Sequence, residues 1–266
     1  MVSQSDLRAC MGHYLKELRL TRIGQTYEAY ATRAVKESLS YERYLYELVE
    51  EEYEVRRRSR IERLLKESRL PLEKSFETFD KKRLPWKVIQ MVNTLSEGSF
   101  LDRKENVLAF GNPGSGKTHL LCAIGQELIR QKVRKISFTP CSLLVQELLR
   151  AKKDLRFAQC LKRLSRYDAI IIDDIGYVQQ DRQEMEVLFT LLADRYERGS
   201  IMLTSNLPFS KWERIFKDPM VTVAAIDRLV HHSVILELNI PSYRIEKAKN
   251  SNNLKEKEGL KKKIDE

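Results

Sequence analysis

Residues 111–118 read GNPGSGKT, in which three glycines precede a lysine and a threonine. The stretch matches the phosphate-binding pattern G-x-x-x-x-G-K-S/T in full. Glycine backbone can turn several N–H groups toward one phosphate, Lys117 would bring a positive charge to the β- and γ-phosphates, and Thr118 would offer its hydroxyl to Mg²⁺. The predicted nucleotide-binding residues are Gly111, Asn112, Pro113, Gly114, Ser115, Gly116, Lys117 and Thr118.

The residues on both sides of this pattern supply the context that a phosphate loop requires. The apolar run VLAF precedes it and predicts a strand, and HLLCAIGQELIR follows it and predicts a helix. The phosphates would then lie at a helix N-terminus, where backbone N–H groups point at the ligand. A glycine-rich turn without a ligand is the alternative. The complete pattern and its two flanks favour an ATP site.

Two carboxylates follow a second apolar run, AIIIDD at residues 169–174. Such a strand end can complete a metal site beside a phosphate loop, because Mg²⁺ is held by one or two carboxylates together with substrate phosphates. We expect Asp173 to hold Mg²⁺ through its water shell and Asp174 to orient or deprotonate the attacking water. A buried strand that ends in a solvated acidic turn is the alternative.

A third apolar run, SIMLTSN at residues 200–206, ends in Ser205 and Asn206. In an open parallel sheet, ligands bind outside the carboxyl ends of the strands. Asn206 is therefore a candidate to hold the lytic water or the γ-phosphate. An asparagine in front of Leu-Pro is also common as a plain turn residue, and the residues alone favour neither interpretation.

The order of the elements predicts an α/β fold. From Asn106 onward apolar strand-like runs alternate with helical stretches, which indicates βαβ units and a three-layer parallel sheet with helices on both faces. Before Pro71 the chain has no β-rich run, and Tyr41, Leu45 and Leu48 follow helical spacing after Ser40, a plausible N-cap. We predict a helical DNA- or partner-binding domain at 1–75, a connector at 76–105, an ATPase domain at 106–246 and a disordered basic tail at 247–266.

Charge points to a polyanionic partner. The formal net charge is +10 and the pI is about 9.3, which favours nucleic acid before a membrane surface. Because no base-reading pattern is evident, duplex DNA would be bound through its phosphates with weak sequence preference. The acidic run from Glu50 to Glu54 lies a turn away, which predicts a separate basic patch; a solvated charged face is the alternative. The predicted DNA-binding residues are Arg56, Arg57, Arg60 and Arg63.

Several protein classes are disfavoured by what the chain lacks. The four cysteines are far apart and no pair has metal-ligand spacing, which favours free thiols in a reducing compartment. The first twenty residues are rich in charge and contain no signal-peptide core, and no apolar run approaches the roughly 18 residues of a membrane span. The expected location is the cytoplasm, with no membrane partner.

The order of the motifs resembles one family of ATPases. The phosphate loop, AIIIDD and TSN are followed by AAIDRLVHHS and PSYR. This order is similar to that of AAA+ ATPases of the branch that contains DnaC-type helicase loaders and IstB transposition helpers. The segment SYERYLYELVEEEYEVRRRSRIERLLKESRLPLEKSFETFD, at residues 40–80, resembles the N-terminal module of the IstB family. IstB is the closer match, and the similarity covers roughly residues 5–247, so only the tail lies outside it.

The resemblance implies more than the residues do. It implies an ASCE-type sheet, ATP-dependent self-association, duplex DNA binding and stimulation of a partner transposase. Arg228 matches the arginine-finger position that reaches a neighbouring subunit's ATP, although by itself it would be taken for a surface ion-pair residue. Arg244 in PSYR is similar to a sensor arginine near the nucleotide.

The chain departs from the AAA+ pattern in two places. The second acidic position is commonly Glu and is Asp174 here, so its carboxylate is one methylene shorter and we expect slow, DNA-stimulated ATP hydrolysis. Little foldable sequence follows Leu238, so the C-terminal helical lid of AAA+ proteins is expected to be missing. Two alternatives stay open: a replicative helicase loader, and a nucleotide-gated DNA-binding protein with negligible turnover.

Overall fold

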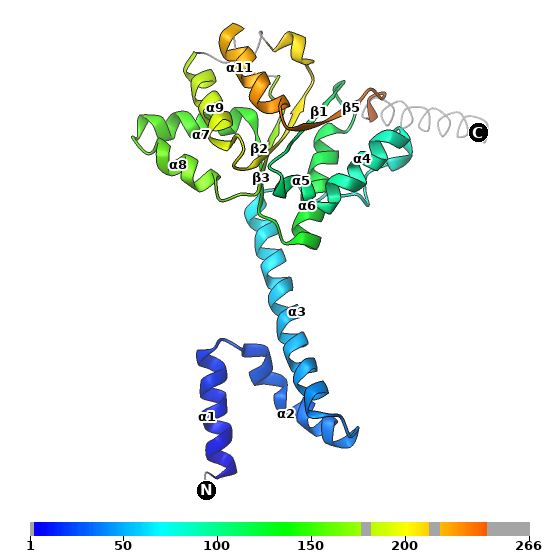
Figure 1. The fold of residues 1–266 in the computed structure, drawn as a ribbon, viewed down its shortest axis with the longest axis vertical. Helices are drawn as coiled ribbons and strands as arrows, with labels where there is room; N and C mark the ends of the chain where they lie inside the picture. The colour runs from blue at the N-terminus through cyan, green and yellow to red at the C-terminus, as the bar shows by residue number, and fades with distance from the viewer. Residues whose placement is uncertain (1–2, 177–181, 213–218, 244–266) are drawn as a thin grey trace, which may run out of the picture. The chain divides into compact units, whose positions relative to one another are not determined.

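The computed structural model describes residues 3–176, 182–212 and 219–243 (Figure 1). Contacts between Cα atoms divide the chain into two compact units, Met1–Arg63 and Leu64–Glu266. These are called the N-terminal unit and the C-terminal unit from here on. The predicted tail at 247–266 and Arg244 lie outside the described residues, as does any lid after Tyr243. The functional boundaries at residues 75, 105 and 246 stay a prediction.

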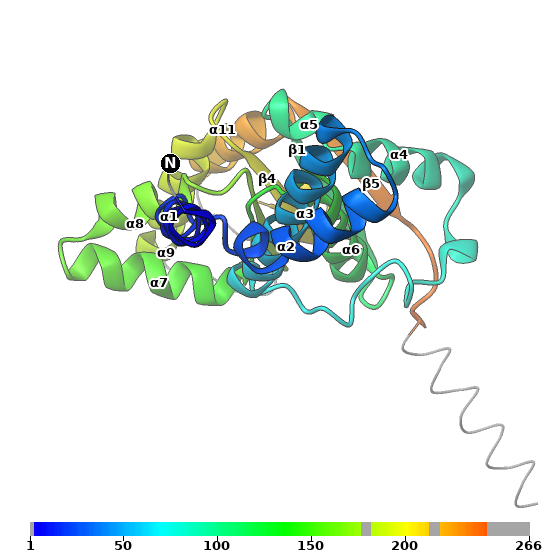
Figure 2. The ribbon, with the colours of Figure 1, turned by 90° about the horizontal axis from the view of Figure 1, so that it is seen from below.

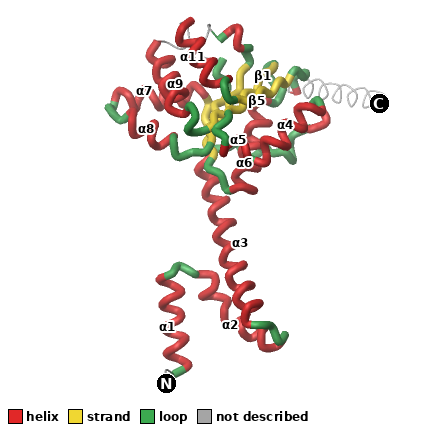
Figure 3. Tube along the Cα trace, in the orientation of Figure 1, coloured by secondary structure: helices red, strands yellow, loops and turns green. Residues whose placement is uncertain are grey.

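The regular elements among the described residues of the N-terminal unit are all helices. It contains α1 (Gln4–Glu17), α2 (Thr21–Lys36) and most of α3 (Tyr41–Ser68), which crosses into the C-terminal unit (Figure 3). Ser40 caps α3 as predicted, because its hydroxyl accepts the N–H of Arg43 at 3.2 Å. The helix ends at Ser68, before Pro71, where the proline disfavours helical backbone in the residue before it.

A buried carboxylate joins α2 to α3. Glu52 on α3 is 6% exposed, and its Oε2 accepts the N–H groups of Arg22 and Ile23 at 2.8 and 3.0 Å. These N–H groups belong to the first turn of α2, which has no partner within its own helix. Burial opposes ionisation of Glu52, but these N–H groups and Arg56 outweigh it and lower the pKa of the carboxyl. Glu52 therefore stabilises α2 in place of a side-chain N-cap.

The C-terminal unit is built around a parallel sheet. Its five strands, in the order β2-β3-β4-β1-β5, all pair in parallel. The strands are β1 (Asn106–Gly111), β2 (Ile136–Pro140), β3 (Ala169–Asp173), β4 (Ser200–Ser205) and β5 (Ser233–Leu238). The helices are η1 (Lys81–Arg83), α4 (Trp86–Glu97), α5 (Ser99–Asp102), α6 (Lys117–Lys132), α7 (Cys141–Lys153), α8 (Phe157–Leu164), α9 (Arg182–Arg195), η2 (Phe209–Lys211) and α11 (Pro219–Val230).

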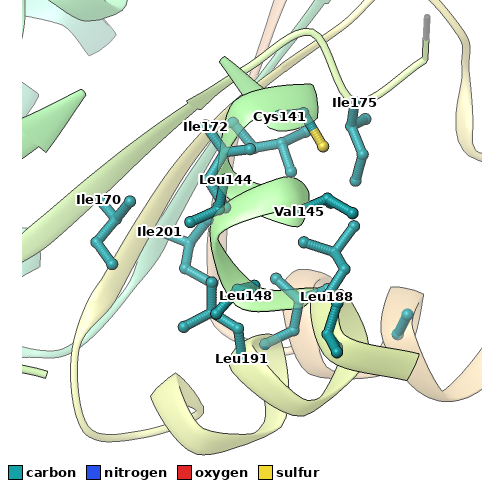
Figure 4. Packing of buried hydrophobic residues seen from close by; sticks show 14 of the residues in the cluster. Cys141, Leu144, Val145, Leu148, Ile170, Ile172, Ile175, Leu188, Leu191 and Ile201 are labelled. Atoms are coloured by element: carbon teal, nitrogen blue, oxygen red, sulfur yellow. The ribbon is translucent and has the colours of Figure 1, made fainter. Parts of the chain in front are cut away.

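Helices cover both faces of the sheet, which confirms the predicted three-layer α/β fold. α7, α8 and α9 lie on one side and α4 and α6 on the other, in both views (Figures 1 and 2). Alternate residues of β3 serve the two faces. Ile170 and Ile172 join the cluster that α7 and α9 cover, shown close up in Figure 4, whereas Ile171 points at Gly125 of α6. All three isoleucines are fully buried, as a doubly covered strand requires.

A buried arginine lies at the end of the sheet where β3 and β4 begin. Arg195, at the end of α9, is 2% exposed. Its guanidinium donates to the carbonyls of Leu164, Tyr167 and Ser200, each at 3.0 Å, and so connects α8 to the starts of two strands. A Cβ on Gly199 would lie 2.3 Å from its Nη2, so glycine is required there. Burial lowers the pKa of Arg195 to about 10, which leaves the group charged at neutral pH.

Replacing this arginine should destabilise the C-terminal unit. Arg195→Leu leaves several buried carbonyls without a donor, and we expect the free energy of unfolding to fall by about 3 kcal/mol. Urea unfolding followed by circular dichroism measures the change. Arg198→Leu is the matched control: Arg198 is exposed and its ion pair with Asp194 spans 3.6 Å. It should change stability by less than about 0.5 kcal/mol. Equal losses in both variants would contradict the role of Arg195.

Candidate functional site

The three predicted polar segments meet at one edge of the sheet. β3, β4 and β1 are neighbours, so their carboxyl ends lie side by side and face a cavity of about 420 Å³. All described lining residues belong to the C-terminal unit. They are Lys74, Thr78, Phe79, Asp80, Arg83, Pro113, Gly114, Ser115, Gly116, Lys117, Thr118, His119, Asp173, Asp174, Thr204, Asn206, Ile240 and Tyr243.

The loop between β1 and α6 has the backbone that a phosphate cradle needs. Gly114 and Gly116 have φ of +79° and +95°, conformations that side chains other than glycine rarely adopt. The space at both positions is also filled, since a Cβ on Gly114 would lie 2.1 Å from Ser242 Oγ and one on Gly116 2.9 Å from the Phe79 ring. α6 begins at Lys117, directly after Gly116. The loop and the helix N-terminus together can hold phosphate oxygens.

Lys117 is held by oxygen atoms from two strand ends. The residue is 7% exposed, and its ammonium donates to the carbonyls of Gly111 and Asn112 at 2.8 and 2.9 Å. It also donates to Oδ1 of Asn206, after β4, at 2.6 Å. The structure thus brings together two residues that are far apart in the sequence. The amide oxygen of Asn206 and a phosphate oxygen would be alternative or simultaneous partners of the same charge.

Asn206 also reaches the acidic pair. Its Nδ2 donates to Oδ1 of Asp174 at 3.1 Å, so one amide side chain connects Lys117 to Asp174. Burial, and then the neighbouring Asp173 carboxylate, raise the pKa of Asp174, against the opposing effect of Lys117. A raised pKa makes a carboxylate a stronger base, which suits a group that accepts a proton from water.

The other carboxylate lies beside the threonine of the phosphate loop. Oδ1 of Asp173 accepts the hydroxyl of Thr118 at 2.6 Å. This pair offers hard oxygen donors, and it fits Mg²⁺, which takes few protein ligands and keeps phosphate and water oxygens around it. Among the described residues no group of three or more His, Cys, Asp or Glu side chains could hold a metal by itself. Thr118 and Asp173 would therefore hold Mg²⁺ only in company with the nucleotide.

One wall of the cavity comes from residues that the sequence analysis assigned to a connector. Phe79 packs edge-on against His119, with ring centroids 5.0 Å apart. Arg83 donates to the carbonyl of Pro241 at 2.8 Å, and its guanidinium lies 5.2 Å from the centre of the Tyr243 ring. The available signal in the sequence was the aromatic pair Phe76 and Phe79, in a stretch without helical spacing. This pair does not indicate which surface the two rings cover.

The segment that directly follows α3 is held to α6 by a buried amide. Gln126 is 1% exposed, and its Nε2 lies within 3.0 to 3.4 Å of the carbonyls of Pro71, Leu72 and Lys74. Directly after the phosphate loop, Nε2 of His119 lies 2.9 Å from the carbonyl of Ser75. The start of α6 thus contacts both the phosphate loop and the chain that leaves α3.

Arg228 does not line this cavity. It lies on α11, where its guanidinium donates to the carbonyl of Ala224 at 3.0 Å and packs over the ring of Phe189 at 5.0 Å. It lines a separate, open hollow together with the exposed apolar residues Met220 and Val223. The structure therefore separates Arg228 from the nucleotide site of its own chain. A role in hydrolysis requires that it act on another copy.

The arginines of α3 correct one expectation from the sequence. The basic patch is not separate from the preceding acidic run, because Nε of Arg56 pairs with Oε1 of Glu52 at 2.6 Å, one helical turn away. Arg56 also donates to the carbonyl of Arg19. A shallow hollow in the N-terminal unit gathers basic residues from α3, from the start of α2 and from the turn before α2. Its arginines are Arg19, Arg22, Arg56, Arg60 and Arg63.

Comparison with known proteins shows the family of the chain. A model of the IstB-like ATP-binding proteins matches residues 13–251. The chain belongs to this family. It is 42% identical over 237 residues to an insertion sequence ATP-binding protein of Sinorhizobium fredii, covering 89% of this chain and 79% of that protein. It is 36% identical over 231 residues to the insertion sequence IS21 ATP-binding protein of Pseudomonas aeruginosa, covering 87% of each.

Solved structures confirm the AAA+ fold of this IstB-like protein. The DnaC helicase loader matches with a TM-score of 0.53 and 16% identity, covering 64% of this chain and 97% of that chain. DnaI matches with a TM-score of 0.53 and 20% identity, covering 64% and 94%. At these identities the likeness concerns the fold alone. In the described part of the chain, no helix is both long and apolar enough to span a membrane.

Two substitutions test the assignment of the IstB-like phosphate site. Lys117→Ala removes the side-chain charge at the phosphates and should weaken ATP binding by at least about 10-fold. Asp173→Ala should retain binding without metal and lose the gain in affinity that Mg²⁺ provides. Titration with a fluorescent ATP analogue, with Mg²⁺ and with EDTA, measures both effects.

Lys132→Ala is the control for these titrations, because Lys132 lies exposed at the other end of α6. It should bind ATP like the unmodified protein. Unchanged affinity in Lys117→Ala, or unchanged Mg²⁺ dependence in Asp173→Ala, would contradict the assignment of that residue.

Proposed function

We propose that this IstB-like protein binds and hydrolyses ATP, assembles on duplex DNA as an ATP-dependent oligomer, and recruits or stimulates a partner transposase. The observation that supports this most directly is the chain of contacts from Lys117 through Asn206 to Asp174. It joins a phosphate-binding loop to a candidate general base. The names of the relatives, which are insertion sequence ATP-binding proteins, support a place in transposition.

The residues of the three polar segments have separate tasks in hydrolysis. The loop N–H groups and Lys117 would neutralise charge on the β- and γ-phosphates, and Thr118 and Asp173 would hold Mg²⁺, which when bound would neutralise further phosphate charge. Asp174 accepts a proton as the water oxygen bonds to the γ-phosphorus and the bond to the ADP oxygen breaks. Asn206 holds the Asp174 carboxylate and contacts Lys117, so it responds to the phosphate that Lys117 binds.

Slow turnover is the expected consequence of the short base. Asp174 is one methylene shorter than Glu, so its carboxylate reaches less far toward a water at the γ-phosphate. Hydrolysis that is slow alone and faster on DNA would let ATP serve mainly to maintain the assembly. Phosphate release measured with and without duplex DNA tests this part of the proposal.

The arginine on α11 would complete the site of a second copy. Arg228 lies away from its own cavity, beside Met220 and Val223, which are 84% and 67% exposed. An apolar surface next to a cation is suited to contact with another subunit. In the assembly, Arg228 would approach the γ-phosphate of the neighbouring subunit and stabilise the charge of the transition state.

Mixing two inactive variants tests this arrangement. Arg228→Ala should retain ATP binding and lose hydrolysis, because the neighbouring site lacks its arginine. Asp174→Asn should also retain binding and lose hydrolysis, because its own site lacks the proton acceptor. A mixture of the two should regain phosphate release, because some interfaces then combine an intact Asp174 with an intact Arg228. Failure to regain activity, when light scattering shows that mixed oligomers form, would exclude a shared site.

Duplex DNA would be bound by the N-terminal unit. The hollow lined by Arg19, Arg22, Arg56, Arg60 and Arg63 gathers positive charge from two elements. Part of that charge is offset by Glu52, which pairs with Arg56. A single copy would therefore make few phosphate contacts and bind weakly at physiological salt. An ATP-dependent array would multiply those contacts through a high effective concentration.

The salt dependence of binding tests the arginine patch. Replacing Arg56, Arg60 and Arg63 together by Ala should weaken binding and lower the log–log salt slope by roughly 2 to 3, as expected for the loss of that many phosphate contacts. Fluorescence anisotropy with a labelled duplex, across a salt series and with a non-hydrolysed ATP analogue, measures the slope.

A matched triple variant makes this test specific. Arg8, Arg33 and Arg43 lie in the same unit and each pairs with a glutamate, Glu28 or Glu47. Their joint replacement by Ala removes the same charge and should leave the slope nearly unchanged. An unchanged slope in the first triple variant would place the DNA contacts elsewhere, most directly on the C-terminal unit.

A helicase loader is the second candidate, because the fold is similar to that of the DnaC helicase loader. A DNA-binding protein with negligible turnover is the third, because Asp174 is short. Adding either a transposase encoded beside the gene or a replicative helicase, and measuring phosphate release on DNA, separates the three. Stimulation by the transposase alone supports the first function, and stimulation by neither partner supports the third.

A further inference from the structure

Thr204 lies next to the acidic pair, directly before Ser205 and Asn206. The last paired residues of β3 and β4 are Ile172 and Leu203, so Thr204 follows in register beside Asp173. Its side chain is 1% exposed and lines the nucleotide cavity. A buried hydroxyl in an apolar strand needs partners, and the partners of this one are both in the acidic pair.

The Thr204 hydroxyl makes two hydrogen bonds whose directions are determined. The backbone N–H of Asp174 can only donate, and it lies 2.8 Å from Oγ1 of Thr204. The hydroxyl accepts that bond, so its single proton is available for Oδ1 of Asp173, 2.7 Å away. The Thr204 carbonyl accepts the N–H of Ile175 at 3.1 Å. One residue therefore holds three consecutive residues at the end of β3, from Asp173 to Ile175.

Asp173 is fixed from two sides by this arrangement. The same Oδ1 accepts the hydroxyl of Thr118 at 2.6 Å and that of Thr204 at 2.7 Å. Two donors on one carboxylate oxygen, one from the phosphate loop and one from β4, restrict the rotation of the side chain. The second oxygen of Asp173 would thereby be held in one orientation, in which it could serve Mg²⁺ together with Thr118.

Asp174 needs the same support for a different reason. Its φ is +63°, in the left-handed region, which is unfavourable for residues other than glycine and is maintained only when the surroundings impose it. The N–H bond to Thr204 holds its backbone, and the bond from Asn206 holds its carboxylate. Without the hydroxyl, the N–H of Asp174 would lose its partner, and the strained conformation would lose one of its two restraints.

We propose that Thr204 is a positioning residue for ATP hydrolysis: its hydroxyl sets the rotation of Asp173 for Mg²⁺ and holds the backbone of Asp174 so that this carboxylate faces the attacking water. The inference rests on the proposed function, because it assigns the orientation of two residues in the hydrolytic site. It adds a residue to which neither the motifs nor the comparisons give a role.

Thr204→Val is the informative change, since valine keeps the branched shape and the γ-methyl group and replaces the hydroxyl with a second methyl group of similar size. We expect kcat for ATP hydrolysis to fall roughly 10- to 100-fold, the effect of leaving a buried donor and a carboxylate underbonded. Affinity for a fluorescent ATP analogue should stay within about 3-fold, because Thr204 contacts no part of the phosphate loop except through Asp173. The Mg²⁺ concentration for half-maximal activity should rise.

The conservative variant separates positioning from packing. Thr204→Ser restores the hydroxyl without the methyl group, and it should recover most of kcat and the original Mg²⁺ requirement. Thr139→Val is the control: Thr139 lies at the carboxyl end of β2, where its hydroxyl contacts only the carbonyl of Pro140, at 3.3 Å, among the described contacts. The same substitution there should leave kcat unchanged.

Three outcomes would overturn the proposal: wild-type kcat in Thr204→Val, equal loss in Thr204→Ser and Thr204→Val, or loss of nucleotide binding in Thr204→Val. If Thr204→Val does not fold, Thr204→Ala replaces it in the comparison with Thr204→Ser and must show the same loss of kcat. If the unmodified protein shows no turnover, the proposed hydrolysis fails on its own. The Mg²⁺ dependence of nucleotide affinity then tests the role of Thr204. This dependence should weaken in Thr204→Val, which lacks the hydroxyl, and should stay unchanged in Thr204→Ser, which keeps it.

Discussion

The buried positive charge of Lys117 is the constraint on which the site depends. A charge with so little exposure must be surrounded by oxygen atoms, and here these are the carbonyls of Gly111 and Asn112 and the amide oxygen of Asn206. The loop must turn back toward its own lysine to supply the first two. The end of β4 must lie beside the end of β1 to supply the third, which the parallel pairing of these strands ensures.

The same edge of the sheet organises the acidic pair. Asp173 ends β3, the other neighbour of β4, and Asp174 follows it, so residues at the end of β4 lie beside groups of both adjacent strands. The side-chain amide of Asn206 contacts Lys117 and Asp174, and the hydroxyl of Thr204 contacts Asp173. The central strand of the site therefore supplies the groups that connect phosphate binding to the base. A change at the phosphate can reach Asp174 through a single side chain.

Residues shortly after α3 line the nucleotide cavity, so part of the cavity wall is close in sequence to the N-terminal unit. α3 crosses the boundary of the two compact units, and the residues after it contact α6 through Gln126 and His119 before Phe79 and Arg83 line the cavity. In the N-terminal unit, Glu52 is shared between the first turn of α2 and Arg56. Its carboxylate offsets part of the arginine charge while it fixes the first turn of α2, which carries Arg22.

The amino-acid sequence by itself determined the α/β class, the phosphate loop and the acidic strand end, because glycine spacing and apolar runs reflect local backbone requirements. It did not determine which groups meet. The contacts of Asn206 with Lys117 and Asp174 join three strand ends, and the connector wall at Phe79 joins residues on both sides of β1. The pairing of Arg56 with Glu52 depended on side-chain direction along α3 and on the burial of Glu52 by α2, which charge counting along the chain cannot express. Tertiary structure decided these contacts because long-range strand order and helix packing place atoms that are distant in sequence within hydrogen-bonding distance.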